Sequence, residues 1–431
     1  MTVAEKTPSQ ARADRRGVVS WALWDWGSSA FHAIILTFVF SVYLTKAVAP
    51  DPDSGSAALG AGLTIAGVFI ALLAPVTGQR GDAGGRRKRW LAVHTGIVVV
   101  AMAALFFVRN APAYLTLGVV LISAASVFAE FAQVNYNALL LRVSTPRTIG
   151  KVSGFGWGMG YFGGLVALTV VLFAFVQPKV GLFGVTSQDG LNIRVVALFC
   201  ALWFGLFALP VLFFVPEPPA SAGASRAGFF ASYGVLARRV AGMWRSERRT
   251  VWFLIASAVY RDGLAAIFTF GGVVAAGTFG FSSSEVVIFA IGANLTAGLG
   301  AVFGGRLDDR LGPKTIIAGS LAALVVLGGC LVVLPGKATF WVCGLALAAF
   351  VGPAQSASRT FLARIVAPER EGEAFGLYAT TGRAVSFLGP LAFSGFLALF
   401  GTQRAGMAGI VLVLVAGLLA LLPVRAPEGA K

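Results

Sequence analysis

The chain alternates long apolar stretches with short polar joins, and this pattern predicts helices that cross a membrane. Each stretch reaches the roughly 20 residues that a spanning helix needs. Six lie in the first half, near residues 20–47, 57–78, 90–108, 111–141, 149–176 and 193–215. Six more lie in the second half, near residues 250–278, 284–304, 314–334, 338–366, 373–400 and 405–424. We predict an all-α membrane protein with twelve transmembrane helices in two six-helix bundles.

Composition agrees with a membrane protein and removes several other classes. Of the 431 residues, 57% are hydrophobic and 12% are charged, which is too apolar for a water-facing globule. Two histidines, and three cysteines inside predicted helices, provide no disulfide framework and no Cys/His metal cluster. The sequence also lacks a Gly-Lys-[Ser/Thr] phosphate loop and a Gly-x-Ser-x-Gly nucleophile elbow. We expect no enzyme activity, no cofactor and no metal.

The distribution of basic residues predicts the orientation in the membrane. If the N-terminus is cytoplasmic, most of the 34 Lys and Arg residues fall in cytoplasmic segments, which is the positive-inside pattern. We expect a multi-pass protein of the cytoplasmic membrane with both termini in the cytoplasm. The run Arg86–Arg89 then faces anionic lipid, so the net charge of +16 needs no nucleic acid to explain it. We expect a monomer.

Between the predicted bundles lies the only long hydrophilic segment. The expected order is a tail at 1–19, a bundle at 20–215, a linker at 216–249, a bundle at 250–424 and a tail at 425–431. Apolar residues recur at helical spacing after Phe229, among several arginines, and this predicts an amphipathic helix on the membrane surface. An unstructured basic linker is the alternative.

Ionisable residues at membrane depth cost about 2.5–3.5 kcal/mol each, so each of them calls for an explanation. They are Asp25, His32, Glu130, Arg261, Asp262, Arg359 and Arg383. All but Arg383 lie in the first helix of a three-helix unit, and equivalent helices of a repeated fold are expected to surround one central cavity. Helical spacing places Gln133 and Asn137 on the face of Glu130, and Gln355 on the face of Arg359.

These residues are our candidates for substrate binding and proton coupling. Arg261 or Arg359 could bind a carboxylate through its planar guanidinium, with Glu130, Gln133, Asn137 and Gln355 as further binding residues. Glu130 is also the best candidate for a proton carrier, because burial would raise the free energy of its charged form. Asp25, Asp262 and Arg383 are candidates for proton coupling or gating. Permanent ion pairing is the alternative for each of these charges, and for Asp25 it is favoured. Trp21, Trp24 and Trp26 bracket Asp25, and their pattern is typical of interfacial anchors.

One loop occurs twice, at the corresponding point of each half. Its first copy contains Gly78, Asp82, Gly85, Arg86 and Arg87, and its second contains Gly305, Asp309, Arg310, Gly312 and Lys314. The repeat indicates that one six-helix unit is used twice, which is typical of secondary transporters. The loop resembles the signature of the major facilitator superfamily. The first copy departs from that signature because Ala83 stands where a basic residue is usual.

Four further segments resemble the autophagy-related vacuolar effluxer branch of that superfamily. They are Ser20–Phe31, Ser153–Gly164, Tyr260–Gly263 and Phe375–Pro390. The resemblance implies a transporter that works by alternating access, and it implies outward movement of amino acids. The arginines independently favour a small zwitterion or an organic acid, and Glu130 makes protons a candidate coupling partner. An exporter of amphipathic drugs or lipid-like molecules is the main alternative, and a membrane sensor or embedded enzyme is an alternative of another class.

Overall fold

The structure, a computed structural model, describes residues 8–217, 234, 238, 241–366 and 370–425. Twelve helical spans in this part of the chain are long and apolar enough to cross a membrane, as the sequence predicts. The amphipathic helix predicted for the linker falls mostly outside the described residues, as do the ends of both predicted tails.

The helices of the first half follow the predicted order closely. They are α1 (Pro8–Ala30), α2 (Phe40–Tyr43), α3 (Pro52–Gly84), α4 (Arg87–Ala104), α5 (Leu115–Ala138), α6 (Leu140–Val143), α7 (Ile149–Val171) and α8 (Leu191–Phe214). The first span continues from α1 through the π-helix η1 (Phe31–Phe38) and α2 to η2 (Leu44–Val48). Asp51 caps α3 by accepting hydrogen bonds from the backbone N–H groups of Asp53 and Ser54, at 3.1 and 2.9 Å.

The second half contains the helices α10 (Arg248–Phe279), α11 (Ser283–Leu311), α12 (Pro313–Val333), α13 (Lys337–Ile365), α14 (Glu371–Ala384), α15 (Leu388–Phe400) and α16 (Gln403–Leu421). The eleventh span, predicted as one helix, is broken into α14 and α15 at residues 385–387. The cause lies in the sequence: Pro390 has no N–H to donate to the carbonyl of Ser386, and its ring crowds that carbonyl.

The described residues pack into two compact units. Unit 1 consists of the described residues within Met1–Ala74, Gly81–Ser144 and Met159–Ala222, and unit 2 of those within Pro75–Arg80, Thr145–Gly158 and Gly223–Lys431. Residues 75–80 of α3 therefore pack with the second half of the chain, and so do the first turns of α7. The sequence assigns both segments to the first bundle.

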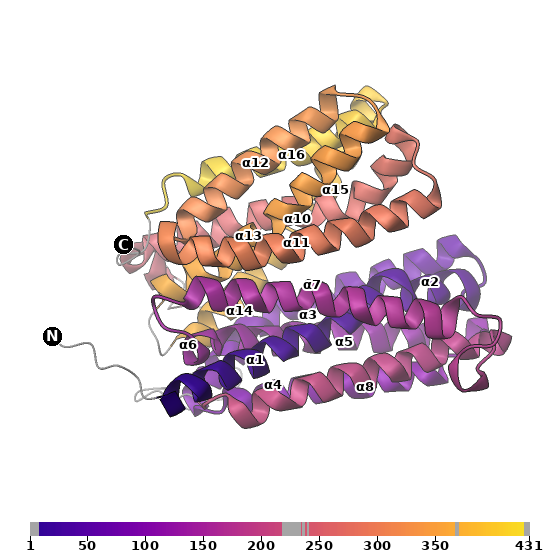
Figure 1. Cartoon of the computed structure of the whole chain (residues 1–431), viewed down its shortest axis with the longest axis horizontal. Helices are drawn as coiled ribbons and strands as arrows, with labels where there is room; N and C mark the ends of the chain where they lie inside the picture. The colour runs from indigo at the N-terminus through magenta and orange to yellow at the C-terminus, as the bar shows by residue number, and fades with distance from the viewer. Residues whose placement is uncertain (1–7, 218–233, 235–237, 239–240, 367–369, 426–431) are drawn as a thin grey trace. The chain divides into compact units, whose positions relative to one another are not determined.

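Within unit 1, α8 packs against α1 and α4, and α4 also packs against α5; Figure 1 shows these helices running lengthwise beside one another. Tyr136 forms the centre of this core, because its ring stacks on those of Trp21 and Trp24, with centroids 4.5 and 4.4 Å away. Trp21 and Trp24 are only 0% and 1% exposed, so their prediction as interfacial anchors is wrong. They belong to the core of the unit.

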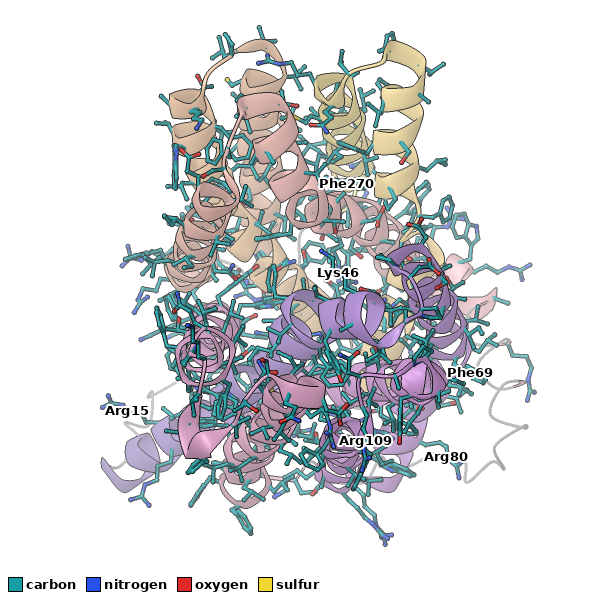
Figure 2. The ribbon with its side chains drawn as sticks, turned by 90° about the vertical axis from the view of Figure 1, so that its right-hand side faces the viewer. Arg15, Lys46, Phe69, Arg80, Arg109 and Phe270 are labelled. Atoms are coloured by element: carbon teal, nitrogen blue, oxygen red, sulfur yellow. The ribbon has the colours of Figure 1, made fainter. Side chains whose placement is uncertain are left out.

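Within unit 2, α13 packs against α11 and α12, and α10 packs against α16. Two stacked phenylalanine pairs, each with centroids 4.1 Å apart, join α10 to its neighbours: Phe253 with Phe361, and Phe270 with Phe393. Large apolar side chains cover the outer faces of both units, and Phe69 is an example in Figure 2. Such surfaces suit a hydrocarbon environment.

Candidate functional site

Arg261 and Asp262, neighbours on α10, hold the two parts of the broken helix. The guanidinium of Arg261 lies 3.7 Å from the ring centroid of Tyr378 on α14, and its Nη1 donates to the Tyr378 carbonyl at 3.1 Å. The carboxylate of Asp262 accepts a hydrogen bond from the backbone N–H of Gly389, in the first turn of α15. Because consecutive residues on a helix point about 100° apart, one short sequence reaches both sides of the break.

The electrostatics of this arrangement are complementary. A helix N-terminus carries partial positive charge, so α15 favours the negative carboxylate of Asp262 beside it. Asp262 is 7% exposed, and a buried charge requires such a partner. The guanidinium of Arg261 is bound by a π-face and a carbonyl, both of which suit a cation. The site therefore presents one cation and one anion next to each other.

Two glycines allow this close packing. A Cβ atom on Gly389 would lie 2.7 Å from Cβ of Ala266 and 3.2 Å from the Asp262 carboxylate. A Cβ on Gly382 would lie 3.3 Å from Nη1 of Arg261. A side chain at either position would thus push on the pair, and glycine leaves the charged groups their room.

In unit 1, Asp25 belongs to a second polar cluster. The hydroxyl of Tyr136 donates to Asp25 Oδ2 at 2.7 Å, and the indole N–H of Trp21 donates to the Tyr136 carbonyl at 3.0 Å. On the same helix, α5, the side chain of Gln133 donates to that of Asn137 at 3.2 Å, so these two predicted binding residues do share a face. Glu130 is half-buried on the same helix, and His32 is exposed.

The structure places the predicted site residues in both units. Asp25, Glu130, Gln133 and Asn137 belong to unit 1, whereas Arg261, Asp262, Gln355, Arg359 and Arg383 belong to unit 2. Gln355 is half-buried, and Arg383 is exposed near the break after α14. Their convergence on one central cavity stays a prediction.

Arg359 has a different environment from Arg261. It is 3% exposed, and it donates to Oγ of Ser153 at 2.9 Å and to the Ser153 carbonyl at 2.7 Å. Its guanidinium also lies 5.7 Å from the ring centroid of Trp157. All three residues belong to unit 2, so Arg359 fastens the first turns of α7 to α13. A substrate anion would have to replace these bonds.

In both copies of the repeated loop, the charged side chains pair with each other or bind the backbone of neighbouring helices. In the first, Asp82 pairs with Arg87 at 2.6 Å, and Arg87 donates to the Ala138 carbonyl at 3.2 Å. Gly85 ends α3 with a φ of 57°, a conformation in which other residues are strained. Gly78 has no room for a side chain, because a Cβ there would overlap the Gly372 carbonyl.

In the second copy, Asp309 caps α7. It accepts from the backbone N–H groups of Gly150 and Lys151 at 2.7 and 2.9 Å, and Arg364 lies 3.3 Å away. Lys314 donates to the Leu422 carbonyl at 2.7 Å. Gly312 has a φ of 83°, and Gly305 packs against α7 without space for a Cβ. Arg310 is exposed at the position that Ala83 has in the first copy, and Arg86 of the first copy is also exposed.

A family model described as "Vacuole effluxer Atg22 like" matches residues 142–431, which is well over half of the chain. The chain belongs to this Atg22-like family. The resemblance predicted from its motifs is thereby confirmed.

Relatives of this Atg22-like chain are found in bacteria and fungi. A protein of Bacillus subtilis (strain 168), described as an uncharacterized MFS-type transporter, is 25% identical over 415 residues, which cover 93% of each chain. Autophagy-related protein 22 of Cryptococcus neoformans var. neoformans serotype D (strain B-3501A) is 24% identical over 287 residues, 62% of this chain and 51% of the fungal one. Our chain therefore spans about half the length of that fungal relative.

Solved structures show the fold. A proton:xylose symporter of the major facilitator superfamily superposes with a TM-score of 0.75 at 14% identity, covering 97% of both chains. The human organic anion transporter MFSD10 gives a TM-score of 0.70 at 16% identity, covering 96% of this chain and 100% of its own. The Atg22-like chain has the major facilitator fold, and it is a secondary transporter of the MFS type rather than an enzyme.

Sequence reasoning missed several residues of the site. Tyr378 and Gly389, which bind Arg261 and Asp262, lie in a segment that the family resemblance identified, but nothing in their spacing assigned them partners. Ser153 was missed because its contact with Arg359 joins residues 206 positions apart. The Gly389-Pro390 pair was an available signal for the break in the eleventh span.

Proposed function

We propose that this transporter exports neutral amino acids or related zwitterions across the cytoplasmic membrane by alternating access, coupled to protons. The observation that carries the proposal is the pair Arg261 and Asp262, which offers adjacent charges of opposite sign at the break between α14 and α15. A zwitterion carries the same two charges in the opposite sense, so the pair complements it.

The chemistry of recognition follows from the groups in the pair. The planar guanidinium of Arg261 suits the substrate carboxylate, which would exchange with the Tyr378 carbonyl. The carboxylate of Asp262 suits the substrate ammonium group. Broken helices form substrate sites in other secondary transporters for the same reason: their ends present unpaired backbone groups.

Replacement of these protein contacts by substrate contacts would also favour movement of the broken helix α14–α15. Charge-assisted hydrogen bonds contribute about 1.5–3 kcal/mol each, so a substrate that replaces those of Arg261 and Asp262 releases α14 and α15 from α10 at small net cost. Binding of the substrate is thereby linked to the position of the broken helix. We assign Arg359 and Asp309 to the packing of α7 in unit 2 and the Asp82–Arg87 pair to the packing of unit 1. We assign Gln133 and Asn137 to the substrate path.

Direction and coupling rest on separate support. Outward movement is supported by the name of the family, whose members are described as effluxers. Proton coupling is supported by the half-buried Glu130, with Asp25 held by Tyr136 as a second carboxylate of unit 1. Both termini would lie in the cytoplasm, as the basic residues predict.

The proposal is tested by efflux from liposomes that contain the purified protein and a mixture of amino acids and organic acids, with and without a pH gradient. Mass spectrometry reads which solutes leave. We expect selective loss of zwitterions, faster with the gradient and abolished by Arg261→Ala. The matched control is Arg194→Ala, because Arg194 also contacts a phenyl ring, at 4.8 Å, and a carbonyl, at 2.6 Å, but in unit 1. Release of an amphipathic dye from parallel liposomes, without loss of any amino acid or organic acid, would instead support the alternative exporter.

A further inference from the structure

A crevice of about 160 Å³ lies in unit 1 between α4 and α8, with Trp24 among its lining residues. Thr95 and Gly96 line it from α4, and Gly205 and Leu209 line it from α8. The indole N–H of Trp24 donates to the hydroxyl of Thr95 at 3.1 Å, so the polar atoms of the lining satisfy each other and leave an apolar space. Arg261 and Asp262 belong to the other unit.

Two glycines keep this space open. A Cβ atom on Gly96 would have no atom within 4 Å, and one on Gly205 would lie at an ordinary 3.7 Å from Val99. Neither glycine is therefore required for close contact between the helices. An enclosed apolar cavity of about 150 Å³ takes up small hydrocarbons, and this crevice offers a similar volume that is open on one side. Leu209 is 48% exposed, so the crevice opens to the outside of the unit, where membrane hydrocarbon is the surrounding medium.

Positive charge lies at one end of the crevice. Lys88 precedes Thr95 and Gly96 by seven and eight positions, which places it on the same face of α4. Its ammonium donates to the carbonyl of Leu212, a lining residue, at 3.0 Å, and this bond uses one of its three protons. Arg89 next to it is exposed.

One carboxylate is also present at this end. Glu217 accepts a hydrogen bond from the backbone N–H of Lys88 at 2.9 Å. Arg86 is also exposed in this part of the chain, so Arg86, Lys88 and Arg89 outnumber the single carboxylate of Glu217. An apolar slot that ends at a cluster of basic side chains has the chemistry of one phospholipid chain and its phosphate.

We propose that the crevice binds one acyl chain of an anionic phospholipid, whose phosphate lies against Lys88 and Arg89. The acyl chain follows the face of α4 from Lys88 past Gly96, and it fills the space that the two glycines leave. The lipid then forms part of the packing between α4 and α8. This site is separate from the transport site, so its test does not depend on the substrate.

Native mass spectrometry of the purified full-length protein, titrated with phosphatidylglycerol or phosphatidylcholine, tests the acyl site. Gly96→Leu places a side chain in the open space, and we expect it to abolish the tightest phosphatidylglycerol adduct of the wild type. The control is Gly319→Leu on α12, where a Cβ also has no atom within 4 Å. Helical content and thermal unfolding are measured for both variants, and Gly96→Ala supplies a smaller filling if Gly96→Leu fails to fold. Retention of the adduct by folded Gly96 variants would overturn the proposal.

Arginine variants test the head-group contact. Arg89→Gln is expected to weaken phosphatidylglycerol binding about fivefold, which corresponds to one basic residue at a membrane surface, and to leave phosphatidylcholine unchanged. The matched control is Arg109→Gln, because Arg109 is exposed beyond the opposite end of α4 (Figure 2). Equal binding of the two lipids by the wild type, or equal effects of the two variants, would contradict an anionic ligand.

Discussion

The contact between Asp262 and the start of α15 supports a quantitative prediction. Replacing Asp262 by alanine removes a charged acceptor from the backbone N–H of Gly389. A hydrogen bond to a charged group contributes about 1.5–3 kcal/mol, and the interaction of a charge with a helix N-terminus contributes about 0.3–1 kcal/mol. Little solvent screening applies, because Asp262 is 7% exposed. The expected loss of unfolding free energy is therefore about 2–4 kcal/mol.

The same reasoning ranks two variants. Asp262→Asn keeps an oxygen acceptor and loses only the charge, so we expect a loss of about 1 kcal/mol. For a unit of 150–250 residues, about 2–4 °C in Tm corresponds to each kcal/mol, which gives a lowering of about 4–16 °C for alanine and about 2–4 °C for asparagine. Thermal unfolding of the purified protein in detergent measures both values.

A surface aspartate provides the control. Asp189 pairs with Arg194 at 3.3 Å, but its side chain is 48% exposed, and exposed pairs contribute about 0–1 kcal/mol. Asparagine also tolerates the positive φ of 52° at this position. Asp189→Asn should therefore lower the Tm less than Asp262→Ala does. If the two variants shift the Tm equally, Asp262 does not hold α15 and our account of the broken helix fails.

Four further predictions follow from single contacts. Glu130→Gln should abolish accumulation driven by a pH gradient but spare substrate exchange, since glutamine cannot carry a proton. Gly382→Ala brings a methyl group to 3.3 Å from Arg261 and should weaken substrate affinity several-fold in a binding titration. Gly154→Leu overlaps the carbonyl of Ala301 on α11, and it should increase labelling of cysteines introduced where α7 packs on α11. The hydrogen bond from the backbone N–H of Ser54 is the main reason that the pKa of Asp51 lies below its ordinary value of 3.8. Asp51 therefore stabilises the start of α3 fully above pH 3.8. This stabilisation is lost as the pH falls through the lower pKa of the folded state. Backbone amide hydrogen exchange at the start of α3, compared between the wild type and Asp51→Asn at each pH, measures this stabilisation.

Each of these predictions has a control or a contrary result. Retained pH-driven accumulation in Glu130→Gln would remove Glu130 as the proton carrier. Gly395→Ala is the control for Gly382→Ala, because a Cβ at Gly395 on α15 has no atom within 4 Å. Unchanged labelling in Gly154→Leu would mean that α7 can be displaced without separating from α11. Equal exchange of the wild type and Asp51→Asn near neutral pH would show that the cap does not hold α3.

The spans of this protein were predictable because a membrane makes hydrophobic length a direct requirement. The start of α12 at Pro313 agrees with the stretch predicted from about 314, whereas α3 begins at Pro52, before the apolar run predicted from about 57. The pair Gly389-Pro390 also indicated the break between α14 and α15, but the apolar run on both sides of this pair favoured a single helix. Local sequence signals thus predicted the helices, and the prediction failed where two such signals conflicted.

The contacts of the candidate site were less predictable. The sequence identified Arg261, Asp262 and Arg359 by the cost of burying charge, which depends only on position along a helix. Their partners include main-chain atoms of residues more than 100 positions away, and a backbone carbonyl or N–H carries no sequence signal. Trp21 and Trp24 were misplaced for a related reason, because tryptophan at the start of an apolar stretch suits an interface as well as a packed core.

The central claim is that Arg261 and Asp262 recognise a zwitterion, and transport of matched analogues tests it most directly. Liposomes with the purified protein are loaded with equal amounts of a neutral amino acid, its amide, its amine without the carboxylate and its carboxylic acid without the ammonium group. Mass spectrometry then follows the initial efflux of all four. Our account predicts that the amino acid leaves faster than the three analogues and that Arg261→Ala removes this preference. Equal efflux of the amine or the amide would contradict it, because the carboxylate would then not be recognised.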